Sequence, residues 1–121
     1  MQLVISRDLL LQAINLISKA ADKRHNMVIL GNMKLALTDS QLVMVASDLE
    51  LELQATLNLP ESACKQPGEI TVPANKFKDI VKLLPDGLPV SISVGNDNQC
   101  LIVCGSSRFK LSTLPAQDFP L

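Results

Sequence analysis

Aromatic residues are scarce in this chain of 121 residues, which has three phenylalanines and neither tryptophan nor tyrosine. Proteins that stack unpaired bases need several exposed rings, so this scarcity argues against a platform for single-stranded nucleic acid. The core must instead come mainly from Leu, Ile, Val and Met, within a hydrophobic fraction of 47%. Such a fraction in a chain of this length predicts one folded domain over residues 1–121 rather than disorder.

Long apolar runs and paired cysteines are also missing. No window approaches the 18 uncharged apolar residues of a membrane span, and the first residues lack the pattern of a signal peptide. The three cysteines include no C-x-x-C pair, which argues against a disulfide framework and a zinc site. Cys100 and Cys104 are spaced to share one buried face of a strand. We therefore expect no membrane contact and a reducing compartment, the cytoplasm.

Motifs of catalysis are absent as well. The chain has no G-x-G-x-x-G, no P-loop and no nucleophile elbow. The single histidine, His25, has no carboxylate partner in the nearby sequence. Asp48, Glu50 and Glu52 are spaced by two, which indicates the solvent face of a strand rather than an acid–base cluster. We expect no catalytic residue, no metal and no cofactor, and therefore not an enzyme.

The first half of the chain begins with a strand-like and then a helix-like pattern. "LVIS" (3–6) predicts a short strand, and Ser6 or Asp8 is placed to cap a helix after it. Apolar residues then recur at helical intervals on one face: Leu10, Ala13, Ile14, Ile17 and Ala21.

Three segments with a period of two follow this helix. "MKLAL", "QLVMVA" and "LELELQATL" predict antiparallel strands joined by hairpins. In the third segment the expected apolar face consists of Leu49, Leu51, Leu53 and Ala55.

The second half repeats this order of elements. "ISRDLLLQAINLI" and "VPANKFKDIVKLL" align without gaps at a spacing of 67, and "VMVASDLELEL" and "LIVCGSSRFKL" align at a spacing of 58. The fold class that this predicts is α+β: a duplicated β-α-β-β-β unit with two helices packed on one face of a mostly antiparallel sheet.

Six of the eleven basic residues fall in two places: Lys19, Lys23 and Arg24 around the end of the first predicted helix, and Lys76, Lys78 and Lys82 on the second. One interpretation is that these side chains only solvate the exposed faces of two helices. The other is that both clusters lie on one helical layer, which would present a positive face to the phosphates of a duplex. Without neighbouring aromatic rings, such a face suits the backbone rather than the bases.

Several motifs resemble the amino-terminal domain of the bacterial DNA sliding clamp, the β subunit of DNA polymerase III. They are "VILGNMKLAL", "SDLELEL", "ITVPANKFKDIVKLLPDG" and "SSRFKLSTLPAQDFP". The resemblance covers the whole chain but only about the first third of a family member. It implies the DNA clamp fold: two subunits of three similar domains form a ring, with helices lining the hole.

The resemblance also implies which residues contact DNA. Arg24 matches an arginine that touches the duplex backbone, and Lys23 flanks it. Lys82 matches a position on the second helix that is commonly basic, with Lys78 one turn away. Lys76 stands where the family often has a basic pair, so one charge is missing there.

A second implied site is the joint between subunits. Phe109 and Leu111, with Arg108 and Lys76, match the edge that meets the third domain of a second clamp subunit. Such an edge strand is open to pairing. The groove for polymerase and clamp-loader peptides would lie in domains absent from this chain, and residues 115–121 would begin the linker to the second domain.

These features favour a processivity factor, part of a ring that encircles duplex DNA without sequence preference and tethers the replicative polymerase. The alternative is a non-enzymatic module that binds duplex DNA or another protein through a duplicated fold. A hydrolase is a more distant third.

Overall fold

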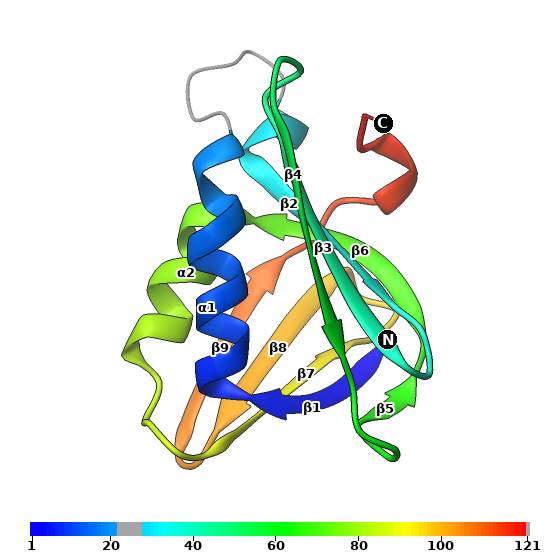
Figure 1. The fold of residues 1–121 in the computed structure, drawn as a ribbon. Helices are drawn as coiled ribbons and strands as arrows, with labels where there is room; N and C mark the ends of the chain where they lie inside the picture. The colour runs from blue at the N-terminus through cyan, green and yellow to red at the C-terminus, as the bar shows by residue number, and fades with distance from the viewer. Residues whose placement is uncertain (22–27, 121) are drawn as a thin grey trace.

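The computed structural model describes residues 1–21 and 28–120. Two helices lie side by side, and curved antiparallel strands wrap around one side of the pair (Figure 1). The first half contains β1 (Gln2–Ser6), α1 (Arg7–Ile17), the short 3-10 turns η1 (Ser18–Ala20) and η2 (Val28–Gly31), β2 (Asn32–Leu37), β3 (Gln41–Ser47) and β4 (Glu52–Asn58). The rest contains β5 (Cys64–Gln66), β6 (Gly68–Pro73), α2 (Ala74–Leu83), β7 (Pro89–Val94), β8 (Gln99–Cys104), β9 (Ser107–Ser112) and the 3-10 turn η3 (Ala116–Asp118).

Both helices form where the apolar spacing predicts them. In α1, the Ser6 hydroxyl caps the first turn by accepting a hydrogen bond from the backbone N–H of Leu9 at 3.4 Å. The helix α2 begins directly after Pro73, whose fixed φ suits a helix start. The residues that the spacing of 67 aligns are buried in both helices: Leu10, Ile14 and Ile17 in α1, and Phe77, Val81 and Leu84 in and just after α2.

The two halves exchange their first strands. β1 pairs with β7 of the second half, with Leu3 opposite Ile92, and β6 pairs with β2 of the first half, with Leu35 opposite Ile70. The strand order is therefore β5-β1-β7-β8-β9 in one sheet and β4-β3-β2-β6 in the other. All these pairings are antiparallel, so neither half contains a complete sheet of its own strands.

The two sheets meet at a seam between Thr71 and Leu114. The two residues exchange backbone hydrogen bonds of 3.0 and 3.1 Å. The buried Thr71 hydroxyl donates to the Leu114 carbonyl and accepts from the Asn32 amide, both at 3.0 Å. The α+β class, the duplicated unit and the helices on one face are confirmed. The strands divide between two sheets, where one sheet was expected, because the last three strands of each half pair with one another and only its first strand crosses to the other half.

The spacing of 58 holds for the third strand of each unit but not for the fourth. Met44 and Ile102, which are 58 residues apart, are both fully buried in β3 and β8. However, Met44 pairs with Ala55, whereas Ile102 pairs with Phe109. Since Ala55 and Phe109 are 54 residues apart, the ungapped alignment is wrong by four positions beyond the hairpin turn.

The shift arises from two different turns. In the first hairpin, the Asp48 carboxylate accepts hydrogen bonds from the N–H groups of Glu50 and Leu51 at 2.9 and 2.6 Å and so closes a longer loop. In the second, Gly105 takes a φ of +58°, as the first position of a tight type II′ turn requires. Leu49 and Leu51 consequently lie in the loop, 57% and 47% exposed, and their expected place on an apolar strand face is wrong.

One main core lies between the helices and the two sheets. It draws residues from both halves, and Phe77 is its largest fully buried side chain. Cys100 and Cys104 lie in it on one face of β8, as predicted. A smaller cluster covers the opposite face of β3, where Phe119 packs against Val45 with the η2 residues Ile29 and Leu30.

Candidate nucleic-acid interface

The exposed face of α2 carries the lysines that the sequence singled out. Lys76 and Lys82 are exposed and Lys78 is half-buried, while Phe77 and Val81 point into the core. Asp79, also exposed, lies between them on the helix and offsets part of their charge. The three lysines thus lie on one helix, away from its apolar stripe, although they span a wide arc of its circumference.

The neighbouring helix α1 contributes a face of different chemistry. Its exposed residues include Asp8, Gln12, Asn15 and Leu16, and the only basic residue within Arg7–Ile17 is Arg7 itself. Lys19, in the following turn η1, is exposed. The positive character of the helical layer within the described part of the chain therefore comes from α2 and from the turn that ends α1.

The predictions for Lys23, Arg24 and His25 concern residues outside the described part of the chain. They remain predictions.

Arg7 does not face outward with the other basic residues but holds the end of α2. Its Nε and Nη2 donate to the carbonyls of Val81 and Lys82 at 3.3 and 3.1 Å, and Nη1 lies 3.0 Å from Asp8 and 2.8 Å from Asp86. The last carbonyls of a helix lack partners within the helix and form the negative end of its dipole, so a guanidinium stabilises them. Arg7 therefore fixes the α2 terminus relative to the start of α1.

Sequence reasoning missed Arg7, although a signal was present. A cation in the first turn of a helix opposes that helix's own dipole, so an arginine directly after the capping Ser6 suggests a partner elsewhere.

The strand β9 is an edge of its sheet, paired with β8 on one side. Leu111 is buried and Phe109 half-buried, and both pack with the main core. Arg108 and Lys110 alternate with them and are exposed on the outer face. The structure thus brings Phe109 and Leu111 together on the inner side of the edge and puts Arg108 on the other.

The acidic residues around the first hairpin form a turn and a solvent face. Backbone hydrogen bonds, first from Leu51 and then from Glu50, lower the pKa of Asp48 below its ordinary value, because they stabilise the carboxylate. Burial raises the pKa of the Cys100 thiol to about 12, which keeps it neutral and a poor nucleophile.

Within residues 1–21 and 28–120, no three His, Cys, Asp or Glu side chains are grouped as a metal site would need. Among the same residues no helix is long and apolar enough to cross a membrane.

A duplicated β-α-β-β-β domain, with two helices on one side of exchanged sheets and open strand edges, defines the class of DNA clamp folds. The family model described as the DNA polymerase III beta subunit, N-terminal domain, matches residues 1–121. The chain belongs to this family.

Individual relatives agree with this assignment. The beta sliding clamp of Pseudomonas putida is 42% identical over 120 residues, which is 99% of this chain and 32% of that protein. That of Escherichia coli K12 is 38% identical over the same shares. Among solved structures, a DnaN sliding clamp of Pseudomonas aeruginosa bound to griselimycin superimposes with a TM-score of 0.94 at 40% identity, over 100% of this chain and 32% of that one. The Caulobacter crescentus beta sliding clamp superimposes with a TM-score of 0.93 at 37% identity, again over 100% of this chain and 32% of that one. This chain spans about a third of the length of these relatives.

Proposed function

We propose that this chain is the amino-terminal domain of a processivity factor, a ring of two subunits that encircles duplex DNA and tethers the replicative polymerase while sliding. The main support is the family match over the whole chain, together with a helical layer in which Lys76 and Lys82 of α2 are exposed. The ring needs no chemistry of its own, so the proposed role is non-catalytic. It acts in the cytoplasm, and residues 115–121 lead toward a second domain.

The DNA-facing residues of this proposal are Arg24, Lys23, Lys76, Lys78 and Lys82. Lysine and arginine contacts to phosphates release counterions and are independent of sequence, which suits a protein that must move along DNA. The exposure of Lys76 and Lys82 supports their part of the proposal, since both side chains can reach a backbone.

A second subunit would close the ring at the β9 edge. A partner strand can pair with the free backbone of β9, next to Phe109 and Arg108, with Lys76 on the neighbouring helix. Leu111 is 6% exposed, so its side chain would support the edge from inside rather than bury much new area against a partner. Polymerase and clamp loader would bind through other domains of the ring.

Salt-dependent DNA binding by the full-length ring tests the DNA surface. Arg24→Ala and Lys82→Ala should each weaken binding on all sequences and flatten the slope of log affinity against log salt by about 0.9 per lost contact. Lys65→Ala is the matched control, because Lys65 is an exposed lysine on β5, away from the helices. If all three variants have the same salt slope as the parent, Arg24 and Lys82 do not contact phosphates and only solvate the protein surface.

Topology tests the ring itself. The full-length protein should stay on circular DNA and slide off the same DNA once it is linearised. Retention on neither form, or on both alike, would favour the alternative, an ordinary duplex-binding or protein-interaction module.

A further inference from the structure

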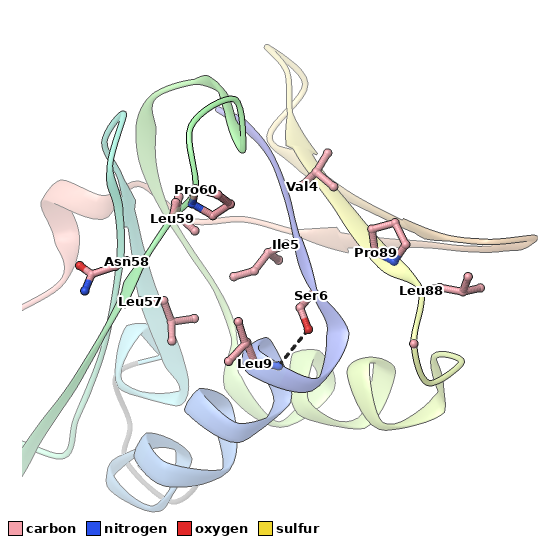
Figure 2. A pocket seen from close by; sticks show the side chains of 11 residues that line it. Val4, Ile5, Ser6, Leu9, Leu57, Asn58, Leu59, Pro60, Leu88 and Pro89 are labelled. Atoms are coloured by element: carbon pink, nitrogen blue, oxygen red, sulfur yellow. Dashed lines mark hydrogen bonds between the residues drawn. The ribbon is translucent and has the colours of Figure 1, made fainter.

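An apolar pocket of about 340 Å³ opens at the corner where β1 passes into α1. Its walls come from three separated stretches of chain: the β1–α1 corner, the end of β4 with the two residues after it, and the loop before β7. In Figure 2 Ile5, Leu9 and Leu57 point toward one another across it. This volume lies within the range of ordinary ligand pockets. None of the residues assigned above to the DNA surface or to the subunit joint lines this pocket, although Leu88 in its wall lies beside Gly105 in the β8–β9 turn.

Two features show that the pocket is open to solvent and apolar. Leu9 and Leu88, both lining residues, are 49% and 41% exposed, so the pocket wall includes aliphatic surface that is in contact with water. Most of the remaining wall is aliphatic or proline, including Leu59, Pro60 and Pro89. A bound group with a branched aliphatic side chain would remove this surface from water.

The backbone beside the pocket is only half paired. β1 pairs with β7 as far as Ser6, but on its other side it pairs with β5 only at Gln2 and Leu3, followed by one bond from the Val4 N–H to the Ala63 carbonyl. Ile5 and Ser6 therefore have a strand on one side only among the described residues. The other wall, β4, lies at the edge of its sheet, with β3 as its one partner strand in the described part of the chain. Such edges accept an added extended strand.

The rim of the pocket is acidic. Asp8, Glu61 and Asp86 each adjoin a lining residue in the chain, and all three are exposed. Arg7 pairs with Asp8 and Asp86, so one positive charge offsets part of three negative charges and leaves the rim net negative by two. A ligand with flanking cations is favoured there over one with flanking anions.

We propose that this corner is a docking site for an extended protein segment that inserts aliphatic side chains into the pocket, pairs with the free edge of β1 or β4, and carries lysine or arginine on either side. The apolar pocket favours aliphatic side chains at the centre of the segment, and the half-paired strands favour an extended backbone. The acidic rim favours lysine or arginine on either side of the aliphatic residues. This inference does not depend on DNA binding or on ring closure.

A short peptide tests the proposal directly. The probe is acetyl-KTLVLTK-amide, titrated into the isotope-labelled chain while backbone amide shifts are recorded. We expect saturable shifts at Ile5, Ser6, Asn58 and Leu59. The peptide acetyl-ETLVLTE-amide should bind more weakly at low salt, with the difference shrinking at high salt. The peptide acetyl-KTSTSTK-amide should not bind.

Two leucines of α1 provide a matched pair of variants. Leu9→Gln should lower the affinity for the lysine-flanked probe peptide about tenfold, because the Leu9 side chain would become buried against the peptide. Leu16→Gln should leave the affinity unchanged, since Leu16 is 66% exposed and is not among the lining residues. Both side chains are already largely exposed, so both variants should fold, and their thermal midpoints confirm it.

Several results would overturn the proposal. They are shifts confined to another surface, equal affinity for the lysine-flanked and glutamate-flanked peptides, or equal loss in the two leucine variants. A concentration-dependent dimer without peptide, with shifts at the same four residues, would instead identify a second copy of the chain as the occupant.

Discussion

Removing the Arg7 side chain should loosen the end of α2 more than any surface charge change nearby. Arg7→Met keeps most of the aliphatic stem but deletes the two hydrogen bonds to the carbonyls of Val81 and Lys82. Charge-assisted hydrogen bonds contribute about 1.5–3 kcal/mol each where they are buried, but one of these two is exposed and should contribute less. The favourable interaction with the helix dipole adds about 0.3–1 kcal/mol. The pairs with exposed Asp8 and Asp86 add between about 0 and 1 kcal/mol.

These contributions overlap, so we expect Arg7→Met to lower the free energy of unfolding by about 2–4 kcal/mol. Urea denaturation followed by circular dichroism measures this loss. Asp8→Asn is the control, because it removes one exposed partner of Arg7 and leaves both carbonyl bonds, and it should cost less than about 0.5 kcal/mol. The loss in Arg7→Met should persist at 0.5 M salt, since hydrogen bonds to carbonyls are screened less than exposed ion pairs. A cost for Arg7→Met no larger than that of Asp8→Asn, or one abolished by salt, would refute this account of Arg7.

Three further changes test other parts of the fold. Thr71→Val should destabilise the protein by about 1–3 kcal/mol, because it leaves the buried Asn32 amide without its acceptor, and Thr113→Val provides a comparison at a similarly buried threonine that lacks a side-chain bond in the seam. Gly105→Ala should cost more than about 1 kcal/mol in thermal unfolding, because φ is +58° there and the new Cβ would lie 3.1 Å from Leu88. Gly95→Ala should cost less, because its φ is not positive and its new Cβ would make only an ordinary contact with the Asp97 carboxylate at 3.8 Å. The Asp48 pKa is lowered in the folded state, so its contribution to stability is present above the unfolded pKa near 3.8 and is lost as pH falls through the folded pKa. Asp48→Ala should therefore differ from the parent at neutral pH and converge with it in acid, and a constant difference at all pH values would contradict the hydrogen bonds assigned to this carboxylate.

The elements of this fold could be predicted where periodicity is local. Leu10, Ile14, Phe77 and Val81 have helical spacing, and all four are buried. The alternation that predicted a strand from Leu49 onward failed, because alternating residues continue through a loop whose length depends on the Asp48 hydrogen bonds.

Relations between distant residues were less predictable. The pairing of β1 with β7 depends on contacts between residues about ninety positions apart, and no single segment encodes them. The exposure of Lys76 and Lys82 followed from the helix period, so the α2 part of the candidate DNA surface could be predicted from the sequence. The role of Arg7 was only partly predictable. A cation in the first turn of α1 suggests a partner elsewhere, but the acceptors are main-chain carbonyls of the other repeat, and main-chain groups leave no pattern in a sequence.

The exchange of first strands has a consequence for how the chain is synthesised. Translation releases β1 first, but its neighbour β7 follows only when residues 89–94 have left the ribosome, and β2 waits for β6 in the same way. Nascent chains fold as whole domains rather than in such halves. Until β7 has emerged, the newborn polypeptide therefore exposes apolar strands such as Leu3–Ile5, and productive folding of this domain becomes possible only after that point.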